Sequence, residues 1–399
     1  MAQLSPISKS SQHFDALVRS EWLAKLARQS LIAEAELTPK PGLVDGRGSG
    51  SHSDLSLDLM RRSADAIAPY FTRMALASAD AQMDTSLRAV VASIGREAEA
   101  AMLRATSGSN AHKGAIWVLG LLVCAASLSE GSLPEFVAQA AGYLARLPDR
   151  ARPQAVSHGD VVLERYGATG ARGEAYMNFP HVAKIGLPAL RAARKSGRTE
   201  RDSRLAALLA IMSDLDDTCV LYRGGPEALK IVHEGAARVI KVGGPGCPKG
   251  NAALIALGQE LVSQRISPGG SADLLAATLF LDALERGLEG VEKDNSLVEE
   301  TMEKIEFSYP EAKRLITKRA HVGVVGSGDL EVLLEPNSEE GGRVFITTSV
   351  NGFGDAWKAV FDRFFSKFDG AARIYINDAG ATPGSVLLRL EQAVEVIEQ

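Results

Sequence analysis

The sequence has few cysteines, no long basic run and no apolar stretch that could cross a bilayer. Its 399 residues include only Cys124, Cys219 and Cys247, an odd number without C-x-x-C spacing, so neither a disulfide framework nor a zinc site is expected. A net charge of −5 argues against a nucleic-acid surface. The N-terminus lacks the apolar core of a signal peptide, and the longest apolar run, 115–126, is shorter than a membrane span. We therefore expect a cytoplasmic protein without nucleic-acid or membrane partners.

Helical periodicity dominates the first three-quarters of the chain. Apolar residues recur at helical spacing from Phe14 to Leu37, and this helix should end at the two prolines of T-P-K-P-G. Sustained strand-like alternation is absent up to Leu288, so residues 1–290 are predicted to form an all-α helical bundle. Further helices are expected near 56–77, 85–105, 114–128, 134–147, 181–195, 202–213, 226–241, 249–264 and 271–287.

The pattern changes after Leu288. Residues 291–302 are charged and lack a convincing apolar face, which is typical of a linker or a solvated helix. Residues 303–399 are predicted to form a small α+β domain. Its alternating runs predict strands near 304–309, 321–325, 330–334, 343–350 and 373–378, with G-S-G-D as a tight hairpin turn and helices at 357–368 and the C-terminus.

The stretch T-S-G-S-N-A-H-K-G, from Thr106 to Gly114, carries the densest polar chemistry of the helical part. Glycines, small hydroxyls and a lysine just before a helix are a common way to present N–H groups and a cation to phosphate. The alternative is an ordinary loop in which Asn or Ser caps the next helix. A capping loop, however, has no need for the adjacent His112 and Lys113.

Other polar stretches interrupt the same hydrophobic background. Cations in glycine-rich loops, together with several carboxylates, are what a polyphosphate with Mg²⁺ requires, whereas P-loop spacing is absent. Each stretch also has a structural alternative, such as a plain turn, a solvated helix end or an ion pair. The residues concerned are Lys40 and Asp45 in T-P-K-P-G-L-V-D, His52 and Asp54 in G-S-H-S-D, Glu99 on the preceding helix, Arg172 and Glu174 in Y-G-A-T-G-A-R-G-E-A, Asp214, Asp217 and Arg223 in D-L-D-D-T-C-V-L-Y-R-G-G, and Asp273 in S-P-G-G-S-A-D-L-L.

These motifs occur in one order that resembles the triphosphoribosyl-dephospho-CoA synthases serving citrate lyase and malonate decarboxylase. The resemblance covers roughly residues 20–287. It implies an enzyme that joins ATP to dephospho-CoA, expels adenine and keeps the triphosphate. The chain departs from the citrate-lyase type at Ala111, at Cys219, where that type has Asn, and at Met177–Phe179.

The tail resembles a second family, the small acyl-carrier subunit of malonate decarboxylase. V-V-G-S-G-D-L-E-V-L-L, T-S-V-N-G and I-N-D-A-G-A-T-P-G carry this resemblance over about residues 303–399. It implies that Ser327, in G-S-G-D, carries the phosphoribosyl-dephospho-CoA prosthetic group. It also implies a separate transferase that attaches the group, and the other malonate decarboxylase subunits as partners.

The resemblance implies roles for the polar residues of the helical domain. Transfer of a ribosyl group builds positive charge on the sugar, which a carboxylate can stabilise, while an acid and a base move protons. The expected assignments are His112 as proton donor, Asp45 as base, Glu99 and Asp217 facing the sugar or holding Mg²⁺, and Lys40, Asn110, Lys113, Arg172, Glu174 and Arg223 binding substrate and phosphates.

Two other functions are compatible with the same residues. A helical domain working at a ribosyl carbon could hydrolyse an N-glycosidic bond with water as the acceptor. Alternatively, the helical part could be an inactive scaffold for the carrier, although a scaffold has no use for the H-K-G and R-G-E stretches. Adenine release that depends on dephospho-CoA would exclude the hydrolase.

Overall fold

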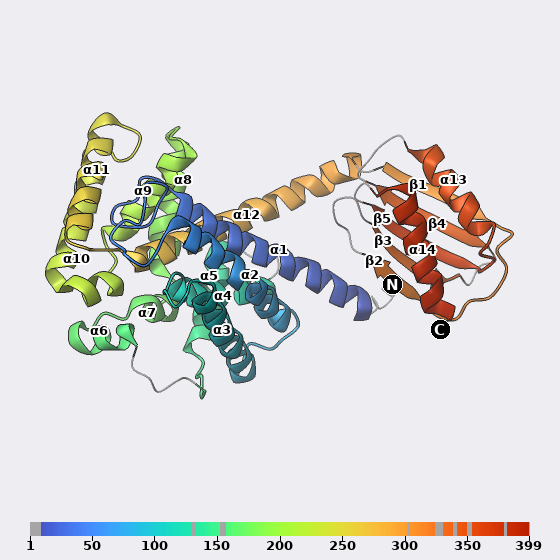
Figure 1. Ribbon diagram of the computed structural model, residues 1–399, viewed down its shortest axis with the longest axis horizontal. Coiled ribbons are helices and arrows are strands. Elements are labelled where there is room, and N and C mark those ends of the chain that lie inside the picture. Colours follow the sequence, from blue (N-terminus) through green and yellow to red (C-terminus); the bar gives the residue numbers. More distant parts are fainter. Residues whose placement is uncertain are drawn as a thin grey trace, which may run out of the picture. The chain divides into compact units, whose positions relative to one another are not determined.

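The computed structural model describes residues 9–129, 133–151, 157–301, 303–323, 330–337, 341–348, 353–378 and 381–398. The chain forms two compact units, Met1–Leu288 and Glu289–Gln399 (Figure 1). The first unit is mostly helical and the second contains a sheet, so the predicted change of structural class along the chain is confirmed. None of the helices in the described part of the chain combines the length and hydrophobicity that crossing a membrane requires.

The helices of the first unit lie in the predicted segments, and the structure contains further helical segments that were not predicted. Sequence periodicity does not predict α6, α7 or the first part of α10, because these segments carry glycine and charged residues in place of a long apolar stripe. The bounds are α1 Lys9–Glu36, α2 Leu57–Ser78, α3 Thr85–Ala105, α4 Lys113–Leu128, α5 Pro134–Arg146, α6 His158–Tyr166, α7 Gly170–Tyr176, the π-helix η1 His181–Gly186, α8 Leu187–Lys195, α9 Glu200–Met212, α10 Thr218–Lys241, α11 Pro248–Ser263 and α12 Gly269–Thr301.

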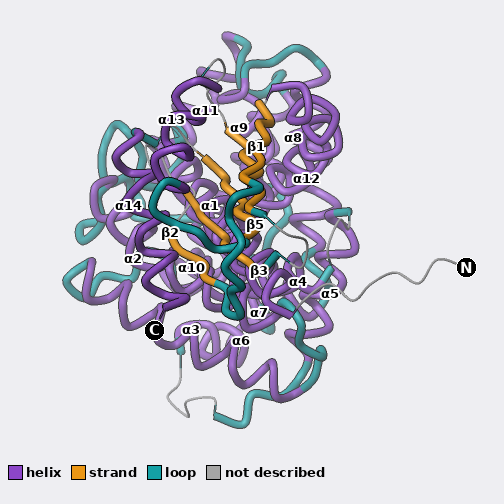
Figure 2. The backbone as a smooth tube through the Cα atoms, turned by 90° about the vertical axis from the view of Figure 1, so that its right-hand side faces the viewer, coloured by secondary structure: helices purple, strands orange, loops and turns teal. Residues whose placement is uncertain are grey.

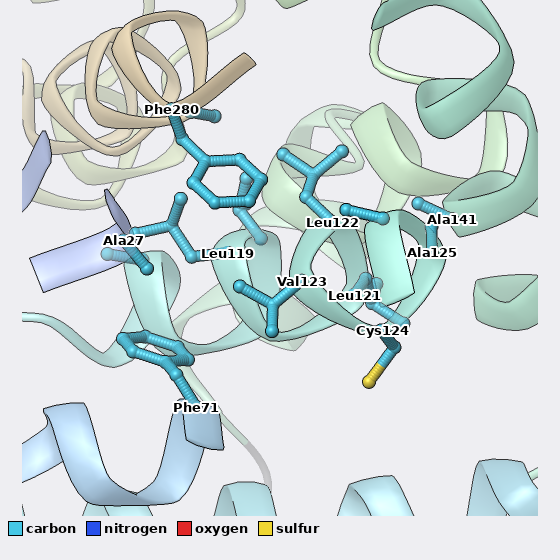
Figure 3. Packing of buried hydrophobic residues seen from close by; sticks show 14 of the residues in the cluster. Ala27, Phe71, Leu119, Leu121, Leu122, Val123, Cys124, Ala125, Ala141 and Phe280 are labelled. Carbon is cyan, nitrogen blue, oxygen red and sulfur yellow. The ribbon is translucent and has the colours of Figure 1, made fainter. Parts of the chain in front are cut away.

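The core of the first unit surrounds α4. Leu119 of this helix is fully buried, and its neighbours in the cluster are Ala27 of α1, Phe71 of α2, Ala141 of α5 and Phe280 of α12 (Figure 3). Burying each large apolar side chain contributes roughly 1.5–3 kcal/mol to folding. The prediction that the apolar run 115–126 is a buried central helix is confirmed. This packing fixes the start of α4, where the polar stretch 106–114 ends.

The second unit contains a sheet with strand order β1-β4-β5-β3-β2, shown in orange in Figure 2. Among the described strands, β4 and β5 pair in parallel and the other neighbours pair antiparallel. The strands lie where alternation predicted them, and β2 pairs with β3 on either side of G-S-G-D, which itself lies outside the described residues. Their bounds are β1 Glu303–Tyr309, β2 Ala320–Gly323, β3 Leu330–Pro336, β4 Gly342–Thr348 and β5 Ala372–Asp378.

Two helices, α13 Gly354–Phe365 and α14 Pro383–Glu398, pack against each other and against the strands. Phe361 of α13 and Leu390 of α14 join Val344, Ile374 and Ile376 in one apolar cluster. Inward and outward residues alternate along β4 and β5, as a sheet with one covered face requires. The predicted linker, 291–302, belongs to α12 as far as Thr301.

Candidate active site

Three helices of the first unit begin close together: α4, α10 and α12. Asp217, which caps α10, accepts hydrogen bonds from Gly270 N (3.2 Å), Ser271 N (2.8 Å) and Ser271 Oγ (3.0 Å) at the start of α12. The carboxylate of Asp273 on α12 lies against Gly114 on α4, where it leaves no room for a Cβ. Helix starts carry partial positive charge, which stabilises the carboxylates of Asp217 and Asp273 where they lie.

The loop between α1 and α2 reaches the start of α12. Ser51 Oγ donates a hydrogen bond to Ile266 O (2.7 Å), and His52 Nε2 lies 2.7 Å from Ser267 Oγ. The first two predicted motifs and the last one therefore meet in space, although more than half of the first unit separates them in sequence.

The start of α7 lies against the start of α10. A Cβ on Gly170 would lie 2.8 Å from the side chain of Thr218, so the close approach depends on glycine. Trp117 Nε1 of α4 donates to Ala171 O over 3.2 Å. These contacts bring the Y-G-A-T-G-A-R-G-E-A motif to the same region as the helix starts.

Lys40 and Asp45 are both buried and engaged within the protein. Lys40 is 2% exposed, and its ammonium donates to Glu34 O (2.6 Å) and pairs with the Glu34 carboxylate. Asp45 accepts hydrogen bonds from Lys40 N (2.8 Å) and Arg47 N (2.8 Å), and its Oδ2 lies 2.7 Å from Arg47 Nη2. Because these contacts occupy both side chains, they favour structural roles over the predicted phosphate binding by Lys40 and proton abstraction by Asp45.

His112 is neutral at physiological pH. Burial and the charge of Lys40 lower the pKa of His112 to about 3. Its Nδ1 lies 2.7 Å from Ser63 Oγ, whereas its buried Nε2 has no hydrogen-bond partner within the described part of the chain. A neutral imidazole can offer a hydrogen bond, whereas full proton transfer from His112, the expected proton donor, would require protonation of a ring whose pKa is strongly lowered.

Asp273 is surrounded by negative charge. Burial raises the pKa of Asp273 well above its ordinary value, and the carboxylates of Glu34 and Asp217 raise it further. Burial also raises the pKa of Asp217, despite its hydrogen bonds from Ser271. A cation bound near Asp273 would relieve this repulsion.

Lys113, Glu99 and Asn110 lie on a more exposed side of the α4 start. Lys113 pairs with Glu99, and the two side chains are 50% and 31% exposed. Asn110 Oδ1 accepts a hydrogen bond from Lys113 N (3.1 Å). Asn110 therefore contacts the first residue of α4 from within the loop, whereas the N-cap residue, His112, makes no side-chain capping hydrogen bond.

Arg172 and Glu174 do not pair with each other. Arg172 Nη1 lies 3.3 Å from Asp160 Oδ1 on α6. Glu174 Oε1 lies 2.6 Å from His181 Nδ1, and His181 Nε2 lies 3.3 Å from Asp214 Oδ2. Burial would lower the pKa of His181, but the hydrogen bond and charge of Glu174, together with Asp214, raise it overall. Glu174 thus orients an imidazole, a partner that the sequence analysis did not single out.

Arg223 is exposed near the start of α10. Burial and the positive charge of Arg223 lower the pKa of His52, while Asp54, with its Oδ1 3.8 Å from His52 Nδ1, opposes the shift. The charge of Arg223 therefore lies within electrostatic reach of His52. Arg223 therefore remains available to a ligand on the exposed side of the site.

Sequence reasoning missed Glu34 and His181 and left Asp273 unassigned. Glu34 sits in a regular helical pattern with no local sign of its pairing with Lys40, and only the fold brings Asp273 to Gly114. In the described residues, no group of three or more His, Cys, Asp or Glu side chains is placed to hold a metal ion.

Comparison with known proteins shows that the first part of the chain is similar to a transferase family and the last part to a carrier subunit. The sequence model of the ATP:dephospho-CoA triphosphoribosyl transferases matches residues 20–291, and that of the malonate decarboxylase delta subunit matches residues 317–397. The chain belongs to the ATP:dephospho-CoA triphosphoribosyl transferase family, as its ordered motifs suggested.

Two relatives illustrate the likeness. A probable 2-(5''-triphosphoribosyl)-3'-dephosphocoenzyme-A synthase of Stutzerimonas stutzeri is 52% identical over 267 residues, covering 66% of this chain and 92% of the relative. The synthase of Klebsiella pneumoniae is 46% identical over 283 residues, covering 71% and 99%. A solved structure, a Pseudomonas malonate decarboxylase hetero-tetramer in complex with malonate, contains a chain that is 48% identical over 24% of this chain and 99% of its own length, with a TM-score of 0.23.

Proposed function

We propose that the first unit binds ATP and dephospho-CoA where α4, α10 and α12 begin, and moves the triphosphoribosyl group to a ribose hydroxyl of dephospho-CoA. The observation that carries this proposal is the convergence of motifs far apart in sequence on one group of helix starts. The hydroxyl oxygen replaces adenine on the ribosyl carbon, and the triphosphate stays attached. N-glycosidic hydrolysis is not supported, because the relatives are synthases.

The triphosphate is proposed to bind the exposed cations that border the helix starts. Lys113, Arg172 and Arg223 are the predicted cations that reach solvent, whereas Lys40 is buried against Glu34. The Lys113–Glu99 pair is exposed and therefore weak, so a phosphate can replace Glu99 as the partner of Lys113. Lys40 is proposed to act indirectly, by fixing Glu34 beside Asp273.

Mg²⁺ fits the donors that border the start of α4. Mg²⁺ bound with a polyphosphate takes only one or two carboxylates and completes its shell with phosphate oxygens and water. Glu99 contacts Lys113, and Asp273 lies against the adjacent Gly114 in a surplus of negative charge. We assign the metal to these two carboxylates in preference to Asp217, whose oxygens already accept hydrogen bonds at two helix starts. The ion would neutralise phosphate charge as adenine leaves.

His112 is proposed to assist departure of adenine by hydrogen bonding through Nε2 as a neutral imidazole. Its position at the start of α4 and its lowered pKa both favour the neutral form. Full-length protein incubated with ATP, Mg²⁺ and dephospho-CoA should give a product with the mass of dephospho-CoA plus a triphosphoribosyl group. A product with the mass of triphosphoribose alone would instead indicate hydrolysis.

The second unit is proposed to be the acyl carrier that receives the finished group on Ser327, which lies outside the described residues. Forming a phosphodiester with the serine consumes the triphosphate that the synthase preserves, so a separate transferase is required. The other malonate decarboxylase subunits would then act on the loaded carrier. Ser327→Ala should leave adenine release intact and abolish covalent loading in protein co-expressed with that transferase. Mass spectrometry that finds the group on the variant would contradict the assignment.

A further inference from the structure

An unusual turn precedes His181, which contacts Glu174 of α7 and Asp214 before α10. Asn178 and Phe179 adopt left-handed backbone angles (φ 65° and 54°), and the π-helix η1 begins two residues later at His181. Consecutive non-glycine residues in this region are costly, and π-helical turns are frequent at functional sites. Phe179 is fully buried, so the fold holds the turn in place.

Glu174 controls the orientation of the His181 ring. Its side chain is 3% exposed and accepts hydrogen bonds from His181 N (3.2 Å) and, at 2.6 Å, from Nδ1. A carboxylate accepts a proton-bearing nitrogen, so Nδ1 carries the hydrogen, and in the neutral form of the ring Nε2 has the lone pair. This is the geometry by which a carboxylate prepares a histidine to act as a base.

The other ring nitrogen lies beside the segment that precedes α10. His181 Nε2 is buried and lies 3.3 Å from Asp214 Oδ2 without a well-formed hydrogen bond, and the Asp214 side chain is 67% exposed. Asp214 lies just before Asp217, the cap of α10. An exposed side chain such as Asp214 can move aside for a ligand hydroxyl, whereas the buried Glu174 cannot.

From this geometry we infer that His181 is the general base that takes the proton from the attacking ribose hydroxyl of dephospho-CoA. The inference rests on the proposed function. His181 takes the role of base that the sequence suggested for Asp45. Asp45 is 3% exposed, forms an ion pair with Arg47 and accepts a hydrogen bond from Lys40 N. Glu174 becomes a positioning residue in place of a direct substrate ligand.

The step balances without a further reactant. The hydroxyl oxygen forms a bond to the ribosyl carbon of ATP as the bond from that carbon to adenine breaks. The hydroxyl proton passes to His181 Nε2 and then to water. The electron pair of the broken bond stays with adenine, which takes up a proton from water and leaves neutral.

Two carboxylates act on the charge of His181. Glu174 on α7 and Asp214 before α10 raise its pKa against the effect of burial. Arg146 on α5 lies close to the turn, but its guanidinium donates to Tyr176 O and to Asn178 Oδ1. The enzyme should therefore lose activity on the acidic side as His181 becomes protonated, and removing Glu174 should move that loss to lower pH.

Dephospho-CoA-dependent adenine release, measured from pH 5 to pH 9, tests the inference in the full-length chain. His181→Gln should lower kcat by about 10²- to 10⁴-fold and change KM for either substrate only a few-fold. It should also abolish the acidic limb of the pH–activity profile, that is, the loss of activity at low pH. Glu174→Gln should shift the acidic limb to lower pH. His321→Gln is the matched control, because His321 forms a similar pair with Glu331 (2.5 Å) in the second unit, and its kcat should equal that of the wild type.

Several results would overturn this role for His181. One is a His181→Gln kcat within threefold of the wild type, and another is a reduced kcat with the wild-type pH profile. If His181→Gln does not fold, an unshifted acidic limb in Glu174→Gln has the same consequence. A wild-type enzyme that releases no adenine in the presence of dephospho-CoA would instead overturn the proposed function. Restoration of His181→Ala activity by added imidazole would support the role directly.

Discussion

Replacing His112 with Gln should make the first unit less sensitive to acid. The folded protein holds this side chain with a pKa of about 3, against 6.5 in an unfolded chain. Below pH 6.5, His112 therefore binds a proton in the unfolded state but not in the folded state, and the free energy of unfolding falls as the pH drops towards 3. Each pH unit is worth about 1.4 kcal/mol, so His112 should account for about 3 kcal/mol of lost stability between pH 7 and pH 4.

Urea unfolding at pH 7 and pH 4 measures this difference. In a Trp357→Phe background the remaining tryptophans, Trp22 and Trp117, both lie in the first unit, so their fluorescence reports on that unit. The loss of stability on acidification should be about 3 kcal/mol smaller with Gln at position 112 than with His. Equal losses in the two proteins would mean that His112 takes up a proton while the unit stays folded, and would refute its neutral burial.

Two further substitutions separate structural cations from ligand-binding ones. Lys40→Met leaves the buried Glu34 unpaired, so urea unfolding should show a destabilisation of about 3–5 kcal/mol. Adding Glu34→Gln to this variant should partly reverse the loss. An unchanged unfolding midpoint in Lys40→Met would contradict the buried pair. Lys113→Ala removes an exposed pair and should change stability by less than about 1 kcal/mol, while steady-state kinetics show kcat/KM reduced about 10- to 100-fold. Unchanged kinetics would remove Lys113 from the site.

The outline of the fold follows from periodicity. Long segments with one strong period, such as α3 and β5, lie almost where the sequence predicts them. The apolar run 115–126 is buried as expected, because a segment without a polar face cannot be exposed along its length. Short helices such as α6 and α7 escape prediction, since their ends are set by capping and by packing against distant segments.

The sequence indicates which stretches the fold brings together, but it does not assign roles to their residues. Glycine-rich and charged stretches such as 106–114 mark the regions that meet at the helix starts. Sequence cannot show that Lys40 is enclosed with Glu34, or that burial leaves His112 neutral, because both depend on contacts between separate helices. The sequence around His181 gives no sign of a functional role, because its proposed role depends on the contact with Glu174 and on the turn at Asn178 and Phe179.

Adenine release by the full-length protein, with and without dephospho-CoA, tests the central claim most directly. Purified protein is incubated with ATP and Mg²⁺, and free adenine is quantified by chromatography over time. A synthase should release adenine only when dephospho-CoA is present, in equal amount with the triphosphoribosyl product. Adenine release at the same rate without dephospho-CoA would identify a hydrolase, and no release under either condition would leave the helical unit as a scaffold for the carrier.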